Sequence, residues 1–592
     1  MDVAANYIDQ ILIFSIFALS LNLLLGYAGQ VSVAHASFGA IGGYGAGYLS
    51  ITHGWNLFVG AAIGALLAGV IGAAVALPAL RLSVEYLILL TLGVSSVLLG
   101  LFTTFPQLGG TYGLIGIPPA SIFGFDLLTT TDWLIPLVVI LLVIYGLCHR
   151  LGETAYGRVL KGIRDDPEAT QSLGKNVVWF KVAIFGITCA MAGLAGALLA
   201  GFNSLATPSQ FGFDVSLTIL AMVIFGGTGN LVGSILGAAT VILTKPLLEW
   251  AVSLSPEIAS LWRLTLYGLL LVVLMRLRPQ GLLPEGVTLW RPATWRAGAA
   301  PVQPTDVTPA HVVEEAEDWE TGRTESDAEV AAREAGWTDQ PVVLEVEGLS
   351  KKFGSIVAAE DLSMVLRKGT ITALVGPNGA GKTTVFNLLT GFITPDSGSV
   401  KLNGVELVGT TPNRVANAGM VRSWQDVRVI PRMNSLQNVM LGVQEQTGER
   451  LGPLFLAPGA VRRREDEVRE EAMEWLRFVG MDAFANETAG ALSFGQSKLV
   501  ALARVLATNA DVLLLDEPAS GIDRQWVDAM LGLIEKVREQ GRTVCIVEHN
   551  LMVVDRLADH TYFMELGRIT DEGTFTELTS SPRLAEAYFG TA

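Results

Sequence analysis

Long apolar stretches fill the first half of the chain. Six of them carry at most one charged residue each: Ile8–Leu25, Leu57–Leu77, Tyr86–Phe105, Trp133–Cys148, Val182–Phe202 and Ile258–Met275. A helix needs about 20 mostly apolar residues to cross the roughly 30 Å hydrocarbon core of a bilayer. These stretches therefore predict membrane-spanning helices, the first of them a retained span, because no basic region or cleavage site precedes it.

Two further apolar stretches are rich in glycine and alanine. They are Val33–Leu49 and the run Val215–Leu243, which Gly226-Gly227-Thr228-Gly229-Asn230 interrupts. A broken helix is tolerated in lipid only where protein or a wet cavity satisfies its backbone. We expect two short helices in the second stretch and about eight spans in all.

Basic residues predict the orientation of these spans. The segment between Cys148 and Val182 is the basic-rich loop of this half, with Arg150, Arg158, Lys161, Arg164, Lys175 and Lys181. Arg276 and Arg278 follow the last span. Cytoplasmic loops carry an excess of Lys and Arg, so we expect both segments in the cytoplasm, with an even number of crossings between them.

The second half has a different pattern. Short β-rich runs alternate with helical stretches, which predicts an α/β domain with a mainly parallel sheet. The runs are Val342–Val346, Thr370–Val375, Val512–Leu515 and Thr543–Val547.

Charge divides the chain in the same way. Residues 1–290 hold 24 Asp, Glu, Lys and Arg residues, and the other 302 residues hold 72. Residues 301–340 contribute −9 to the net charge of −16, so the acidity belongs largely to a linker and indicates no nucleic-acid surface. We predict a membrane domain at 1–290, a flexible acidic linker at 291–341 with a possible short helix near Glu325–Glu334, and a soluble domain at 342–592. Three dispersed cysteines exclude a disulfide framework.

A phosphate-binding loop is the strongest chemical signal. Residues 376–383 match G-x-x-x-x-G-K-[ST], between an apolar strand pattern and a helical run at Thr383–Leu389. Backbone N–H groups of such a loop surround phosphate oxygens, Lys382 reaches the β- and γ-phosphates, and the Thr383 hydroxyl binds Mg²⁺. The predicted nucleotide contacts are Gly376, Pro377, Asn378, Gly379, Ala380, Gly381, Lys382, Thr383 and Thr384.

Adjacent carboxylates end a second buried-strand pattern. Asp516 at the end of Val512–Leu515 is placed to hold Mg²⁺, and Glu517 to polarise an attacking water. In the alternative interpretation these residues are structural, and Asp516-Glu517-Pro518 caps the helix that follows the strand. The phosphate-binding loop upstream favours the catalytic interpretation.

Further motifs between and after these two resemble ABC-transporter ATPases over Val342–Leu578. Leu492, Ser493, Phe494, Gly495 and Gln496 resemble the family's signature motif, although Phe494 stands where a second glycine is commoner. Gln425, which follows Trp424, resembles the Q-loop glutamine, and His549 resembles the switch histidine. The resemblance implies that both are catalytic residues together with Glu517. It also implies that Gln425 contacts the metal. Asp523 resembles the D-loop aspartate, and Phe353 replaces the usual tyrosine that stacks on adenine.

This resemblance implies ATP and Mg²⁺ as cofactors and a head-to-tail arrangement of two such domains. Each ATP would lie between one phosphate loop and the partner's signature motif. The implied fold is a polytopic all-α membrane domain of about eight spans, some broken, followed by an α/β P-loop ATPase domain.

Residues 1–285 resemble the permease of the branched-chain amino-acid importer family. The matching stretches are Gly26–Phe38, Gly109–Pro118, Gly157–Asp165, Phe225–Gly233 and Arg278–Gly281. In importers of this class the long cytoplasmic loop forms a coupling helix that docks beside the Q-loop, which implies roles for Gly157, Arg158, Arg164 and Asp165. Helical patterning runs through Arg158–Leu173. Topology alone would explain the loop's charges but not its length.

Polar residues in the apolar half have two interpretations. His35, Gln30 and Asn230 lie beside glycine-rich interruptions and could line a substrate path. Gly39, Gly43 and Gly47, four residues apart, more often indicate close helix packing.

The sequence thus predicts ATP-driven import of branched-chain or other hydrophobic amino acids across a bacterial inner membrane, with the ATPase in the cytoplasm. The resemblance implies a second permease and ATPase, or a homodimer, and an extracytoplasmic solute-binding protein. Urea, short amides and aromatic acids remain alternative cargoes. An ABC exporter and a membrane-tethered ATPase without transport are the rival functions.

Overall fold

The computed structural model describes residues 2–79, 84–251 and 336–579, with positions 268, 269, 273, 276, 278 and 280–285 between them. The chain divides into two compact units, Met1–Arg164 with Val177–Ala297 and Asp165–Asn176 with Gly298–Ala592. Apart from single positions, the predicted span Ile258–Met275 lies outside the described residues, as do the helix near Glu325–Glu334 and most of the linker.

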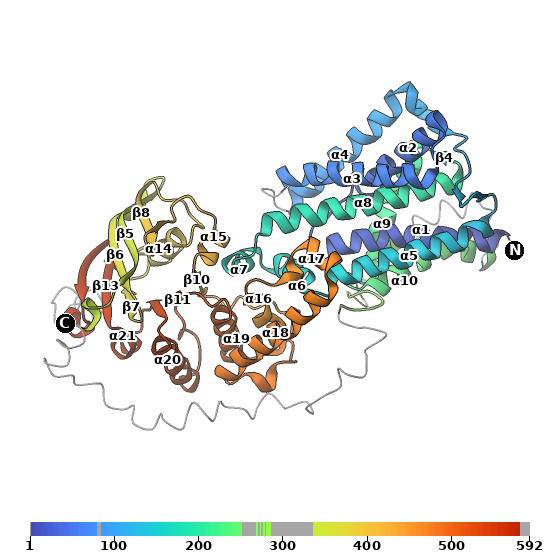
Figure 1. The fold of residues 1–592 in the computed structure, drawn as a ribbon. Coiled ribbons are helices and arrows are strands. Elements are labelled where there is room, and N and C mark those ends of the chain that lie inside the picture. Colours follow the sequence, from blue (N-terminus) through green and yellow to red (C-terminus); the bar gives the residue numbers. More distant parts are fainter. Residues whose placement is uncertain are drawn as a thin grey trace. The chain divides into compact units, whose positions relative to one another are not determined.

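The first unit is helical (Figure 1). Its helices are α1 (Asp2–Asn22), α2 (His35–His53), α3 (Leu57–Ala79), α4 (Val84–Thr104), α5 (Thr130–Gly152), α6 (Ala155–Asp165, whose last residue falls in the second unit), α8 (Val177–Asn203), α9 (Phe213–Gly226) and α10 (Leu231–Ala251). Short strands β1 (Leu114–Ile115) and β4 (Leu205–Ala206) pair with each other, as do β2 (Ser121–Ile122) and β3 (Phe125–Asp126).

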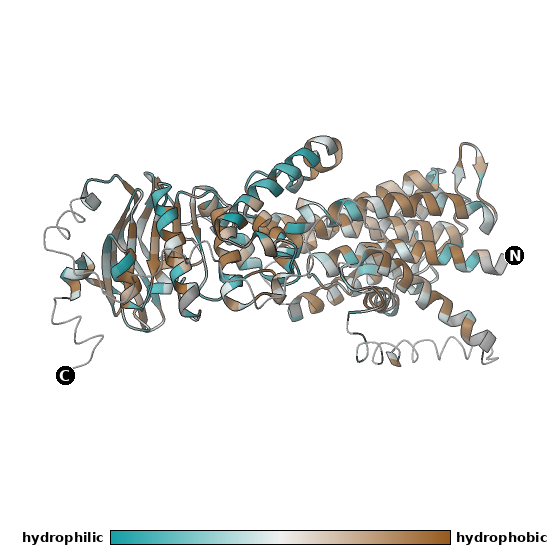
Figure 2. Cartoon of the chain, turned by 90° about the horizontal axis from the view of Figure 1, so that it is seen from below, coloured by the Kyte–Doolittle hydropathy of each residue, from teal (hydrophilic) through white to brown (hydrophobic). Residues whose placement is uncertain are grey.

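Six helices of the described residues are long and apolar enough to cross a membrane. Five of them match predicted stretches to within one residue at the ends of each stretch or contain them, and the sixth is Pro208–Gly226. Figure 2 shows these helices predominantly brown, the colour of apolar residues. The predicted multi-span helical domain is confirmed. The glycine-rich α2 and the shorter apolar stretch Leu231–Thr244 of α10 fall outside the six.

Close packing of α2, α3 and α8 explains the glycines of α2. A Cβ atom built on Gly42 would lie 1.8 Å from the carbonyl oxygen of Gly193, and one on Gly196 would lie 2.0 Å from that of Gly39. On Gly43 and Gly47 it would lie 2.9 Å from Phe211 and from Ile117. The helix-packing interpretation is therefore confirmed for Gly39 and Gly43, which meet α8, whereas Gly47 meets the loop residue Ile117.

The break between α9 and α10 is satisfied by protein groups. Asn22 of α1 accepts a hydrogen bond from the Gly229 N–H (2.8 Å) and donates to the Asn230 carbonyl (2.8 Å). The N–H groups of Leu282 and Leu283 donate to the carbonyls that end α9, at 2.9 and 3.0 Å. Side-chain and backbone groups of the protein thus satisfy backbone groups that this interruption frees.

His35 and Asn230 also have structural partners. The His35 ring nitrogen Nε2 lies 2.7 Å from the Ser20 hydroxyl, and the ring is buried. The Asn230 side chain accepts from the Gly233 N–H at 2.9 Å and donates to the Pro284 carbonyl at 3.0 Å. Gln30 is buried, and its carbonyl oxygen Oε1 has no hydrogen-bond partner.

The second unit contains a six-stranded sheet in the order β10-β11-β12-β7-β13-β14. Its strands are β10 (Met420–Arg422), β11 (Val512–Asp516), β12 (Thr543–Val547), β7 (Ile371–Val375), β13 (His560–Glu565) and β14 (Arg568–Gly573). All pairings are parallel except β13–β14, which confirms the mainly parallel sheet.

A four-stranded antiparallel sheet accompanies it, in the order β6-β5-β8-β9. Its strands are β5 (Val342–Phe353), β6 (Ile356–Arg367), β8 (Ser397–Leu402) and β9 (Val405–Glu406). The helices of this unit are α7 (Pro167–Ser172), α14 (Lys382–Leu389), α15 (Pro412–Asn417), α16 (Ser435–Gly442), α17 (Leu451–Leu456), α18 (Pro458–Phe478), α19 (Phe494–Leu506), α20 (Arg524–Glu539), α21 (Leu551–Leu557) and α22 (Phe575–Thr579).

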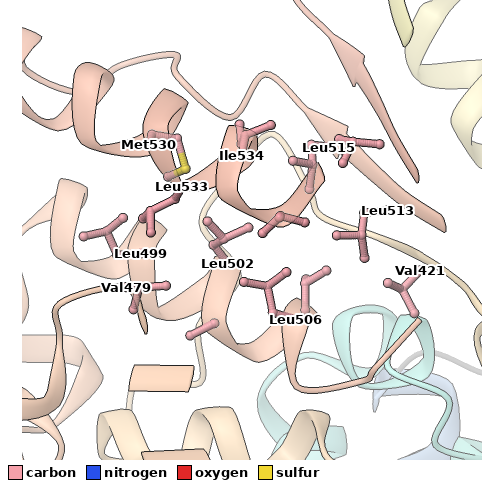
Figure 3. Close-up of a cluster of buried hydrophobic side chains, with 14 of the residues drawn as sticks. Val421, Val479, Leu499, Leu502, Leu506, Leu513, Leu515, Met530, Leu533 and Ile534 are labelled. Atoms are coloured by element: carbon pink, nitrogen blue, oxygen red, sulfur yellow. The ribbon is translucent and has the colours of Figure 1, made fainter. Parts of the chain in front are cut away.

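The central strands are buried on both faces, as their unbroken apolar runs predict. Leu513 and Leu515 of β11 face a core formed with α19 and α20, which Figure 3 shows with Leu502 and Ile534 among its side chains. The alternate residue Leu514 belongs to a second core toward β5 and α14. The two cores fix the carboxyl ends of the parallel strands, where the candidate site lies.

Trp337, at the end of the predicted linker, packs onto the second unit. Its ring stacks on His560 with centroids 3.9 Å apart and planes 9° apart, and the Arg367 guanidinium carbon lies 4.6 Å from the ring centroid. Burial lowers the pKa of His560 to about 4, opposed by Glu577 and assisted by Arg367. Glu572 lies 4.0 Å away.

This arrangement predicts acid sensitivity of the second unit. The unfolded histidine titrates near 6.5, so its neutral form stabilises the fold above that pH and the stabilisation is lost toward pH 4. Between pH 7 and pH 5 the loss is about 2 kcal/mol. Replacing His560 by Gln should remove this part of the loss of stability between pH 7 and pH 5. The measurement is calorimetry of the full chain, on the unfolding transition that responds to ATP. An equal loss of stability between pH 7 and pH 5 in the original protein and in the variant would contradict this prediction.

Candidate active site

Three glycines shape the loop between β7 and α14. Gly376, Gly379 and Gly381 have φ angles of 153°, 84° and 107°, a region that side chains disfavour. A Cβ atom on Gly376 would lie 2.1 Å from the Met564 carbonyl oxygen, and one on Gly381 2.2 Å from that of Ala358. Steric packing as well as backbone conformation therefore requires glycine at these two positions.

Lys382, the first residue of α14, points its ammonium group into this loop. Its Nζ donates to the carbonyl oxygens of Gly376 (2.6 Å) and Pro377 (3.0 Å). Burial lowers the pKa of Lys382, and the carboxylates of Glu517 and Asp516 oppose that shift. The loop thus combines a cation and a helix N-terminus, which together suit phosphate. Thr383 is exposed in the first turn of α14, with Thr384 beside it.

Asp516 ends β11 and is almost completely buried. Its Oδ2 lies 2.6 Å from Nη2 of Arg422, whereas its buried Oδ1 has no hydrogen-bond partner. Burial raises the pKa of Asp516, and Arg422 opposes that shift. A buried carboxylate oxygen without a partner is costly, and a hard cation such as Mg²⁺ would satisfy it. The residues present therefore fit Mg²⁺.

Glu517 brings the three predicted catalytic side chains together. Gln425 Nε2 donates to its Oε2 at 2.9 Å, and Nδ1 of His549 lies 3.7 Å from its Oε1. Glu517 has a φ angle of 46°, and Lys498 Nζ binds its carbonyl oxygen at 3.0 Å. The strained turn is therefore held by a buried lysine that the sequence analysis did not single out.

Ser493 caps α19 in a reciprocal arrangement with Gln496. The Gln496 N–H donates to the Ser493 hydroxyl (3.3 Å), and Gln496 Oε1 accepts from the Ser493 N–H (2.9 Å). Phe494 is half-exposed, with Lys498 Nζ 5.5 Å from its ring centroid. A Cβ atom on Gly495 would lie 2.9 Å from Trp526, so this motif packs against the start of α20, where Asp523 holds the N-cap position without a side-chain capping hydrogen bond.

The other predicted nucleotide contacts differ in their exposure. Phe353 ends β5 half-exposed, with Lys351 Nζ 5.7 Å from its ring centroid, so its outer face can accept a planar base. Leu492, in contrast, packs partly buried against the hydrophobic core. The flanking loop residues Asn378 and Ala380 lie between β7 and α14 as expected.

The helical patterning predicted through Arg158–Leu173 is present but interrupted once. The structure has α6 and α7, separated at Asp166. Pro167 lacks the N–H that a continuing helix needs, and Asp166 caps α7 by accepting from the Ala169 N–H at 2.9 Å. Proline at the first helical position was the signal for this break.

The segment Asp165–Asn176 makes polar contacts within the second unit. Arg428 pairs with Glu168 (2.7 Å) and Asp166 (3.4 Å), and Lys175 pairs with Glu449 (2.7 Å). Gln444 Nε2, Trp424 Nε1 and Asn417 Nδ2 donate to Leu173, Ser172 and Gly174 at 2.7, 3.4 and 3.3 Å. This face lies beside Gln425, which follows Trp424 in sequence.

The predicted coupling residues are distributed over both units. Arg164 pairs with Glu285 at 2.9 Å in the first unit, Arg158 is buried, and a Cβ on Gly157 would lie 1.9 Å from the Gly152 carbonyl oxygen. Asp165 begins the segment of the second unit. Sequence reasoning missed the carboxylates of α7 and their partner Arg428, although opposite charges beside a Q-loop motif were a usable signal.

Known families match each half of the chain. Residues 3–275 match the permease component of the branched-chain amino acid transport system, and residues 359–520 match the ABC transporter family.

Curated relatives of the chain are ATP-binding proteins of branched-chain amino acid transport. The high-affinity protein BraF of Pseudomonas aeruginosa is 36% identical over 252 residues, covering 42% of this chain and 98% of BraF. LivG of Salmonella typhimurium is 35% identical over 254 residues, covering 43% and 99%. A nucleotide-free ATP-binding cassette from an ABC transporter is 30% identical, with a TM-score of 0.38, covering 42% of this chain and 100% of that one.

Both halves therefore point to one class of transporter. The chain belongs to the ABC transporter family, and it joins a permease domain of the branched-chain amino acid type to an ATPase domain that couples ATP hydrolysis to transport.

Proposed function

We propose that this protein imports branched-chain or other hydrophobic amino acids across a bacterial inner membrane. The observation that carries the proposal is the agreement of two independent halves: a permease match over residues 3–275 and ATP-binding relatives named for the same transport system. The basic residues of the loop between α5 and α8 support a cytoplasmic location for the ATPase.

Each residue of the site has a role in the proposed hydrolysis. Lys382 and the loop amides bind the phosphates, and Phe353 stacks on the base. Glu517 orients and polarises the attacking water, and His549 contacts the γ-phosphate. Thr383, Asp516 and Gln425 would hold Mg²⁺, which when bound neutralises phosphate charge.

The signature motif acts in a second ATPase domain under this proposal. Ser493 and its neighbours are held by α19 and α20, and the half-exposed Phe494 leaves the motif accessible to a partner. Either a second copy of this chain or a separate permease and ATPase completes the two sites. An extracytoplasmic solute-binding protein delivers the cargo.

Coupling runs through α7 in this proposal. α7 and the residues that follow it make polar contacts with residues 417–449, and closure of the ATPase domains would act on α7 through these contacts. Movement of α7 is passed to α6 and α8, which flank it in the chain.

Reconstituted vesicles test this function directly. With ATP inside and the solute-binding protein outside with leucine, accumulation should require both the binding protein and Lys382, and Lys382→Ala should abolish it. The matched control is Lys536→Ala, near the end of α20. Vesicles that hydrolyse ATP at the full rate with all partners present but never accumulate leucine, valine or phenylalanine would contradict the proposed cargo, and accumulation of urea or short amides would replace it.

A further inference from the structure

A buried arginine holds the carboxylate proposed to bind the metal. Arg422 ends β10, next to β11 in the sheet, and its side chain and that of Asp516 are both only 1% exposed. Its Nη2 pairs with Oδ2 of Asp516, and its Nη1 donates to Asn387 of α14. Since Oδ2 is occupied by Arg422, the unpartnered Oδ1 is the oxygen left for a cation.

Trp424 connects this arginine to a second one. The guanidinium carbons of Arg422 and Arg428 lie 4.5 and 3.9 Å from the centroid of the Trp424 ring. A cation within about 6 Å of an indole ring is attracted by the ring's quadrupole. Phe392 packs edge-on against the same ring, with centroids 5.1 Å apart. The indole therefore contacts two cations and a second aromatic ring.

Carboxylates at the two ends compensate these charges. Asp516 pairs with Arg422, and Glu168 and Asp166 of the α7 segment pair with Arg428. Trp424 itself donates to Ser172, the last residue of α7. A continuous series of charge contacts, Glu168–Arg428–Trp424–Arg422–Asp516, thus joins α7 to the metal-binding carboxylate.

We propose that Arg422 and Trp424 are positioning residues, and that this series makes the binding of Mg²⁺ with ATP depend on whether α7 is seated on Arg428. When Glu168 leaves Arg428, the guanidinium keeps only its longer contact with Asp166 and changes its contact with Trp424, and Arg422 and Asp516 lose their fixed orientation. The inference rests on the proposed function, since it takes Asp516 as a metal ligand and α7 as the coupling segment.

Nucleotide affinity, measured with and without metal, tests the inference. The full chain carrying Glu517→Gln would be titrated with ATP in Mg²⁺ and again in EDTA, and the ratio of the two dissociation constants gives the contribution of the metal. Glu168→Gln and Trp424→Leu should each reduce that ratio about threefold to tenfold. Affinity in EDTA should stay unchanged, whereas a merely structural defect would weaken both.

Two variants serve as controls. Trp424→Phe keeps an aromatic face and should restore most of the ratio. Lys175→Gln removes a different ion pair of the same segment, that with Glu449, and should leave the ratio as it was. The double variant Glu168→Gln/Trp424→Leu should lose no more than Trp424→Leu alone, because both changes interrupt one series.

The inference is overturned if Glu168→Gln keeps the full ratio or if Lys175→Gln lowers it equally. The second result would mean that α7 acts by docking alone. Failure of the proposed function is a separate result: ATP affinity that does not respond to Mg²⁺ in the starting protein, or vesicles that do not transport.

Discussion

Replacing Glu517 by Gln should reduce ATP hydrolysis about 10²- to 10⁴-fold while ATP remains bound. The amide keeps the shape of the carboxylate and an oxygen that can accept from Gln425, 2.9 Å away. It loses the negative charge that polarises water, and general-base catalysis contributes a factor of that order. The measurement pairs steady-state phosphate release with retention of radiolabelled ATP by the same purified chain.

Glu539→Gln is the matched control, because Glu539 is exposed at the end of α20. It should hydrolyse ATP at the unmodified rate. A Glu517→Gln protein that hydrolyses within fivefold of the original would assign the base to another group. Loss of ATP binding in that variant would instead show that Glu517 holds the fold of the loop.

Replacing Gly196 by Ala should destabilise the membrane unit by about 3 kcal/mol. The added Cβ atom would lie 2.0 Å from the carbonyl oxygen of Gly39, so α2 and α8 would have to separate along their contact. A backbone oxygen cannot rotate away as a side chain can, and protein interiors hold little free volume. The expected result is a lower yield of monodisperse protein in detergent and a lower melting temperature.

Gly93→Ala provides the comparison within the same unit. No heavy atom lies within 4 Å of a Cβ atom built on Gly93 of α4, and alanine is the better helix former. This variant should match or slightly exceed the original stability. Equal behaviour of the two variants would show that the contact between α2 and α8 tolerates an extra methyl group.

Local patterns predicted the elements that surround the site. The apolar runs of β7 and β12 and the loop before α14 are each specified within a few residues, because strands buried on both faces have continuous apolar sequences. Of the antiparallel sheet, only the start of β5, Val342–Val346, was predicted in this way. Its long strands β5 and β6 mix charged and apolar residues and shift register, and Asp361 in β6 has a φ angle of 50°.

Tertiary contacts set the limit of the sequence prediction. The break after α9 was recognisable from its glycines, but not its partner Asn22, which lies 207 positions away from Gly229. The roles of Arg422 and Glu168 likewise depend on which distant groups they meet. Catalytic residues of the ATPase were assigned by spacing within motifs, whereas residues that orient them carry no such pattern.

The contact between Ser172 and Trp424 joins residues 252 positions apart. A ribosome adds about 5 to 20 residues per second, so roughly 13 to 50 seconds separate the synthesis of the two. Throughout that interval Glu168 lacks its partner Arg428, while the apolar helices that follow it are synthesised. Formation of this contact is therefore a late step in biogenesis, and a nascent chain truncated before Arg428 would present an uncovered acidic turn that cellular quality control could recognise.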